Sequence, residues 1–288
     1  FVANWWVPGQ REGEEDAYKK WREYGDKESW TTLHGPMYVP TKVEDGGKLG
    51  YSAWGAFGML VHDLSDIRNP KLIGQFYPKM EKGGLPFHTI DIARLNRGFV
   101  ITNPEVLNPD CNEPLQPLWV VDVKDPTKPK ALAKLPTPVP PSDAPYSHFC
   151  DKRGRFGPHN PPHMKAPGKA NPNFTAYAYF NAGVQFYNIE DPSKPRNVGY
   201  FIPPQPGDLD DYLSYPRDAG AVFIEWDRKL MWCGTGTGLR PGQAGIPVQS
   251  RRDASGRGGA PLAPGGVPEG VCLQGHDRRR RGQGGDGA

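Results

Sequence analysis

One motif occurs three times in this chain and constrains its fold more than any other feature of the sequence. Each copy has a short apolar run ending in Asp or Asn, then a turn containing Asp and Pro, a second strand-like run and a closing Pro. β-Branched and aromatic residues favour strands, whereas Pro presets φ and Asp accepts hydrogen bonds from the turn backbone. The motif therefore predicts one β-hairpin in each copy, at residues 59–78, 118–138 and 184–204.

Two further strand-like segments precede each hairpin, so each repeating unit has four predicted strands. In the three units these segments are 33–40 and 49–55, 86–93 and 97–104, and 157–165 and 174–181. A fourth unit begins with 219–226 and 229–236. Units of roughly 50–70 residues with four strands are typical of β-propeller blades. The sequence therefore predicts an all-β fold: a β-propeller of four-stranded blades, incomplete in this chain, with three blades and part of a fourth.

The hairpin motif resembles the LVIVD repeat, and the segment "LWVVDVKDPTKP" at 118–129 is the copy most similar to it. The three hairpins that carry the resemblance span residues 59–204, and the units that contain them extend it to residues 32–238. It implies a propeller and little about chemistry. Two positions depart from the pattern, Ile67 in the first copy and Asn188 in the third. Propellers close with about four to eight blades, so we expect about six or seven in the intact protein.

The last part of the chain, residues 240–288, differs in composition from the rest. It has 13 Gly and 8 Arg but no Lys, Phe, Trp or Tyr, so it lacks the large side chains that offset ordering entropy. Three interpretations stay open: a flexible tail, an Arg-rich tail that binds RNA, and a reading-frame shift in a GC-rich gene near Leu239. We therefore expect an N-terminal extension at 1–31 with a short helix near 14–24, blades at 32–239, and a disordered or frame-shifted tail at 240–288.

The charge of the chain gives no reason to expect nucleic acid as a partner of the blades. The tail has eight Arg and four acidic residues, which leaves −1 of the net +3 for residues 1–239. No run reaches the roughly 18 apolar residues of a membrane span, so none is expected. The four cysteines are irregularly spaced and indicate no disulfide framework. They leave the cellular compartment open.

Three histidines fall at matching places in the repeat. His34, His88 and His159 each open the predicted first strand of a unit. The first strand of a blade lines the central channel, so these side chains are expected to converge on the axis. The fourth unit has Arg217 and Asp218 near this position instead of His. Because imidazole binds transition metals, the pattern predicts a site for Fe, Cu or Zn.

The loop at 146–168 holds two further candidate metal ligands, His148 and His163, together with Cys150. Long loops on a rigid scaffold commonly form binding surfaces. We expect this loop to cap the channel, with His148 or His163 reaching the axis. A local zinc site within the loop and a nucleophilic Cys150 are the alternatives.

These features favour a metal-dependent enzyme, an oxidoreductase or lyase, acting on a small organic substrate at the central channel. The alternative is a non-catalytic propeller that binds a partner through its surface, because a repeat scaffold does not by itself define a function. In that case the histidines would be polar channel residues without a metal.

Overall fold

The computed structural model describes residues 2–7, 9, 11–16, 33–40, 47–78, 87–162, 167–203, 218–236 and 238–243. Their regular structure is almost entirely β-strand, arranged in four antiparallel sheets. The protein is therefore all-β, as the sequence predicts. Within these residues, no helix has the length and apolar character needed to cross a membrane.

Two sheets have four strands each, and in both the strands follow one another in chain order. The first contains β1 (His34–Tyr38), β2 (Leu49–Ala53), β3 (Met59–Asp63) and β4 (Lys71–Phe76). The second contains β5 (Phe87–Asp91), β6 (Phe99–Pro104), β7 (Trp119–Asp122) and β8 (Lys130–Lys134). A short 3₁₀ helix, η2 (Leu95–Arg97), lies between β5 and β6.

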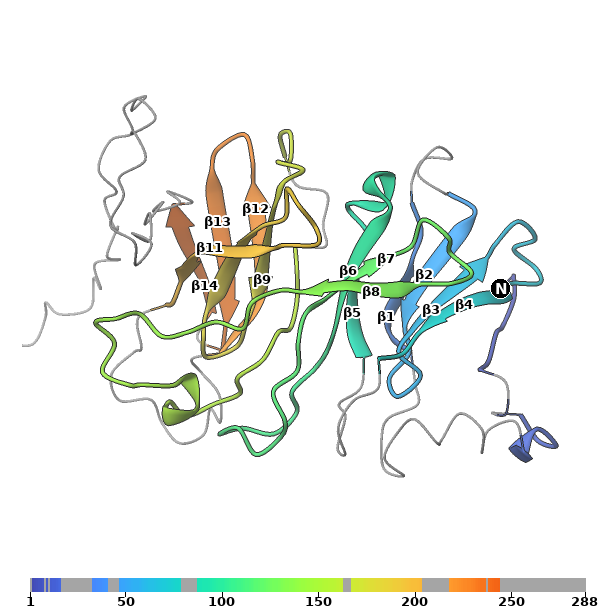
Figure 1. The fold of residues 1–288 in the computed structure, drawn as a ribbon, viewed down its shortest axis with the longest axis horizontal. Coiled ribbons are helices and arrows are strands. Elements are labelled where there is room, and N and C mark those ends of the chain that lie inside the picture. Colours follow the sequence, from blue (N-terminus) through green and yellow to red (C-terminus); the bar gives the residue numbers. More distant parts are fainter. Residues whose placement is uncertain are drawn as a thin grey trace, which may run out of the picture.

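The other two sheets have three strands each. The third contains β9 (Phe174–Ala178), β10 (Val184–Asn188) and β11 (Arg196–Phe201), and a second 3₁₀ helix, η3 (Phe149–Asp151), precedes it. The fourth contains β12 (Ala219–Glu225), β13 (Leu230–Thr235) and β14 (Gly238–Gln243). Figure 1 shows the first two sheets on the right and the last two on the left.

The three predicted hairpins are confirmed as β3–β4, β7–β8 and β10–β11. Their turns use the chemistry expected from the motif. The Oδ1 atom of an Asp in each turn accepts a hydrogen bond from the backbone N–H two residues later, at Asp66, Asp125 and Asp191. Each turn is thus closed by residues within the motif itself, which explains why it could be predicted locally.

The first strand of the third unit differs from the prediction. Of residues 157–162, the described part of the predicted segment 157–165, only two pair with β9: the N–H of His159 donates to the carbonyl of Ala178, and the N–H of Ala178 donates to the carbonyl of Asn160, both at 2.9 Å. Prolines on both sides of this pair lack the N–H that a longer ladder would need. Residues 157–162 therefore form no regular strand.

The predicted boundary of the blades at residue 239 is crossed by a strand. β14 begins at Gly238, ends at Gln243 and pairs with β13 along its whole length. The remainder of the predicted tail lies outside the described residues, as does most of the helix predicted near 14–24.

Successive sheets pack face to face, and their strands alternate between two buried faces. Along β6, Phe99 and Ile101 belong to the core shared with the third sheet, whereas Val100 belongs to the core shared with the first. Likewise in β9, Tyr177 faces the second sheet and Ala176 the fourth. Because neighbouring side chains in a strand point to opposite faces, each inner sheet is covered on both sides.

Candidate metal centre

The packing of successive sheets brings the starts of their first strands together. Isolated β-bridges tie the start of β5 to the first unit and the start of β12 to the third. His88 and Gly220 each follow the bridged residue, so they occupy equivalent positions. The fourth unit thus presents Gly220 where the second presents His88. Asp218 lies two residues earlier, and Arg217 lies outside the described residues.

The three histidines from the repeat gather around one carboxylate, that of Glu105. The Nε2 atom of His88 lies 3.3 Å from Oε2 of Glu105, and the Nε2 atom of His159 lies 3.4 Å from Oε1. The ring of His34 lies against that of His88, with 3.7 Å between the ring centroids. Candidate ligand atoms of His34, His88 and Glu105 all lie within 4.8 Å of one another.

Glu105 was missed by the sequence reasoning, although the sequence contains a signal for it. It directly follows β6, whose last residue Pro104 pairs with Phe87 at the start of β5. In an antiparallel sheet the end of one strand lies beside the start of its neighbour, so Glu105 is brought next to His88. Burial raises the pKa of the Glu105 carboxyl, although the neighbouring guanidinium of Arg155 acts in the opposite direction.

The contacts of the two ring nitrogens of His159 indicate which nitrogen carries the hydrogen and which holds the lone pair. Its Nδ1 atom lies 2.5 Å from the carbonyl oxygen of Gly220, which can only accept, and 2.9 Å from Nδ2 of Asn160, which can only donate; the shorter contact is a hydrogen bond when Nδ1 carries the hydrogen. In the neutral ring, Nε2 then holds the lone pair and is directed at Glu105. A backbone carbonyl that holds Nδ1–H in this way is the usual partner of a metal-binding histidine.

A similar arrangement orients His88. Its Nδ1 atom contacts the hydroxyl of Thr89, and that hydroxyl donates to Oδ1 of Asn160 at 3.3 Å. With its hydrogen directed at Asn160, the hydroxyl accepts from Nδ1–H of His88; with its hydrogen directed at His88, it donates to Nδ1 instead. The Nε2 atom of His88 faces Glu105, and in the first of these two arrangements it holds the lone pair of the neutral ring.

The guanidinium of Arg155 links Glu105 to the fourth unit. It donates to Oε1 of Glu105 at 2.9 Å, and its Nε atom lies 3.5 Å from Oδ2 of Asp218. It also lies over the ring of Phe180, 3.8 Å from the centroid. Burial raises the pKa of Asp218 to about 6, with the hydrogen bonds and charge of Arg155 opposing that rise. Arg155 belongs, with Lys152 and Arg153, to a basic part of the loop whose residue types suit a carboxylate or phosphate, but its partners Glu105 and Asp218 follow only from the fold.

The distances within the group are compatible with the ligands of one ion. Charge-assisted N–H···O bonds measure about 2.7–2.9 Å, which is shorter than the two His–Glu105 separations of 3.3 and 3.4 Å. Two ligand atoms about 2.0–2.1 Å from one ion at a tetrahedral angle lie about 3.3–3.4 Å apart. Each separation is therefore compatible with two ligands of one ion, and because the two involve different oxygens of Glu105, a single ion would be held by both carboxylate oxygens.

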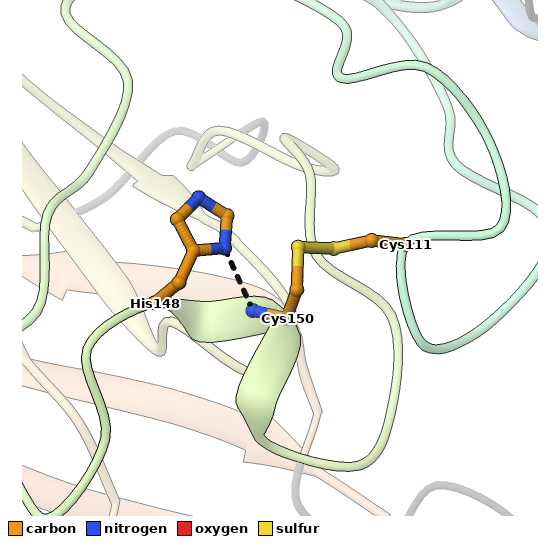
Figure 2. A group of neighbouring side chains, drawn as sticks. All are labelled: Cys111, His148 and Cys150. Atoms are coloured by element: carbon orange, nitrogen blue, oxygen red, sulfur yellow. Dashed lines mark hydrogen bonds between the residues drawn. A yellow bond between two sulfur atoms is a disulfide. The ribbon is translucent and has the colours of Figure 1, made fainter.

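The other predicted ligands lie apart from this group. His148 is exposed and neighbours Cys111 and Cys150, which form a disulfide with a Cα–Cα distance of 5.5 Å (Figure 2). The irregular spacing of the cysteines did not predict this single pairing, and Cys150 has no free thiol in this state. His163 lies outside the described residues.

Comparisons with known proteins do not identify a family for this chain. No protein-family model and no curated protein matches it. Two of the solved structures that it resembles are the computationally designed proteins Ika4 and Ika8, each 10% identical and each matched over 77% of this chain. The TM-scores are 0.38 and 0.39, and the match covers 94% of Ika4 and 48% of Ika8. What the structure itself defines is an all-β protein with a cluster of three histidines and one glutamate.

Proposed function

We propose that the four sheets are successive blades of a β-propeller of the LVIVD-repeat type, and that His34, His88, His159 and Glu105 bind one transition-metal ion. Two observations support the blades: the hairpin turns repeat their chemistry, and each sheet packs face to face with the next. Blades arranged in this way bring equivalent first-strand positions to one axis.

The observation that carries the metal proposal is the orientation of the imidazole rings. His88 and His159 both present Nε2 to the same carboxylate, and each has Nδ1 bonded on its outer side. When both rings are neutral and carry their hydrogen on Nδ1, the lone pairs of the two Nε2 atoms face the carboxylate, and these groups repel one another. A cation between them removes this repulsion. Imidazole and carboxylate together suit Fe, Cu or Zn.

For the activity, we propose a metal-dependent enzyme, an oxidoreductase or lyase, that acts on a small organic substrate at this centre. The bound ion would act as a Lewis acid on a substrate oxygen. Iron and copper accept more than four ligands, which leaves room for a substrate beside the protein side chains. The exposed His34 marks the accessible side of the group, and the guanidinium of Arg155 holds Glu105 in place.

Elemental analysis of the purified full chain, exchanged into metal-free buffer, tests the proposal. We expect about one equivalent of Fe, Cu or Zn in the wild type and a loss of most of it in His88→Ala, because an inner ligand is removed. His148→Ala, in the disulfide-bonded protein, is the matched control and should retain the metal. Turnover in a panel of small organic substrates, present in the wild type and absent in His88→Ala, tests the enzymatic part.

The opposite result is equally clear. If the wild type holds no metal, and Zn²⁺ and Co²⁺ bind the wild type and His88→Ala with the same affinity, the metal proposal is wrong. The histidines would then be hydrogen-bonded channel residues, which favours the non-catalytic binding propeller.

A further inference from the structure

Cys111, His148 and Cys150 lie together where two loops meet (Figure 2), and they form a group separate from that of His34, His88 and Glu105. Their candidate ligand atoms are all within 4.8 Å of one another. We propose that these three residues form a second metal site, for a thiolate-binding divalent ion such as Zn²⁺, when the disulfide is reduced. This site is independent of the function proposed above.

His148 and Cys150 are held in place by hydrogen bonds within the turn that contains them. His148 is the N-cap of η3, where its Nδ1 atom accepts from the N–H of Cys150 at 3.1 Å. The carboxylate of Asp151 accepts in return from the N–H of His148 at 2.9 Å and from the hydroxyl of Ser147 at 3.0 Å. This capping box fixes the spacing of His148 and Cys150 without any contribution from the disulfide.

The loop that contains Cys111 is held against that turn by contacts that survive reduction. The N–H of Asp110 donates to the carbonyl of Gly154 at 2.9 Å, and the N–H of Gly154 donates to Oδ1 of Asp110 at 3.1 Å. The salt bridge between Arg155 and Glu105 joins the same two loops. Cys111, the residue after Asp110, is therefore kept near Cys150 when the sulfur–sulfur bond opens.

The chemistry of the switch is a two-electron reduction followed by metal binding. A phosphine reductant and one water convert the disulfide into two thiols, and the phosphine becomes a phosphine oxide. Binding of Zn²⁺ then displaces two protons from the thiols, and His148 provides the third ligand through Nε2, or through Nδ1 once that atom releases the N–H of Cys150. Two thiolates and an imidazole are a typical donor set for zinc, with water in the fourth position. The disulfide-bonded form has no thiolates and cannot bind the ion in this way.

Cobalt titration of the full chain tests this site, because thiolate-bound Co²⁺ has a charge-transfer absorption that nitrogen and oxygen ligands do not produce. Every sample carries Cys272→Ser, which removes the cysteine outside the described residues. After phosphine reduction we expect one equivalent of Co²⁺ with this absorption, displaced by Zn²⁺, and none in the oxidised protein. The band should persist in His88→Ala, which separates this site from the one containing Glu105.

Three variants assign the ligands. Cys111→Ser should abolish the absorption, and His148→Ala should weaken Co²⁺ binding at least about tenfold. Cys233→Ala is the matched control, because this third cysteine of the described residues is buried in β13; it should leave the band unchanged.

Three outcomes overturn the proposal. The first is a reduced wild type that keeps its β-sheet circular dichroism but shows no thiolate–cobalt band. The second is a band whose affinity is the same in His148→Ala. The third is unfolding on reduction that Zn²⁺ does not reverse, since the ligands would then not be held together by the contacts described here.

Discussion

The guanidinium of Arg155 donates to the carboxylate of Glu105 at 2.9 Å, and the two residues come from loops that the Cys111–Cys150 disulfide ties together. Glu105 lies six residues before Cys111, and Arg155 lies five residues after Cys150. The same junction thus orients the carboxylate that faces His88 and His159. The loops contribute as much to this group of residues as the strands do.

The first prediction concerns this ion pair. Arg155→Met leaves the carboxylates of Glu105 and Asp218 without their shared cation in a mostly buried position. We expect the free energy of unfolding to fall by about 3 kcal/mol, because a buried pair is broken on one side only. Urea denaturation followed by circular dichroism measures this change.

A matched control is available at the surface. Arg228 and Glu225 also form an ion pair at 2.9 Å, but the Arg228 side chain is 63% exposed. Arg228→Met should therefore cost about 0–1 kcal/mol. If both variants lose the same free energy of unfolding, the Arg155 ion pair stabilises the fold no more than a surface ion pair does.

The second prediction is a pH dependence that arises from Asp218. Burial raises its pKa in the folded state to about 6, above the ordinary value of 3.8. The folded protein therefore holds this proton more tightly than the unfolded chain, so the stability contributed by Asp218 is lost as the pH rises through this window. Relative to Asp218→Asn, we expect the wild type to lose on the order of 3 kcal/mol between about pH 4 and pH 6 and little above that range.

Urea denaturation of both proteins at several pH values gives the difference directly. The comparison with Asp218→Asn removes the contributions of all other titrating groups, including Glu105, as long as these are the same in both proteins. If the difference in unfolding free energy between the wild type and Asp218→Asn does not vary with pH, Asp218 has the same pKa in the folded and unfolded states.

The third prediction concerns Gly154, which has a φ of +106° and lies against Asp218. A Cβ atom at this position would be 2.5 Å from Oδ1 of Asp218. Gly13 also has a positive φ, +82°, but a Cβ there would meet no atom within 4 Å. Backbone strain of about 1–3 kcal/mol applies to Ala at either position, and only Gly154→Ala adds the contact with Asp218.

Gly154→Ala should therefore destabilise the protein clearly more than Gly13→Ala in the same urea assay. It should also lower the affinity for metal, because Arg155 is the next residue. Equal effects of the two substitutions would contradict the close approach of this loop to Asp218.

The fourth prediction concerns the disulfide. The bond closes a loop of 39 residues, and loop-closure entropy for that length corresponds to about 4 kcal/mol. The double variant Cys111→Ala/Cys150→Ala should lose stability of that order in urea. The reduced wild type should lose a similar amount in the presence of a chelator and recover part of it with Zn²⁺. A loss below about 1 kcal/mol in both would show that the bond constrains the unfolded chain very little.

The sequence alone was sufficient for the hairpins and for the equivalence of His34, His88 and His159. Each hairpin turn is closed by an Asp and prolines within a few residues, so its conformation depends on local chemistry that a sequence displays. Repetition then places the three histidines at corresponding positions, and the structure brings them together. That they bind a metal stays a prediction.

Only the tertiary structure decided which other residues complete the group. Glu105, Arg155 and Asp218 lie up to 113 positions apart in the chain and meet because the sheets stack and two loops are joined by a disulfide. It also showed that Cys111 and Cys150 are paired and that His148 lies beside them. Contacts of this kind depend on the packing of whole sheets, so they cannot be predicted from the spacing of residues along one strand or turn.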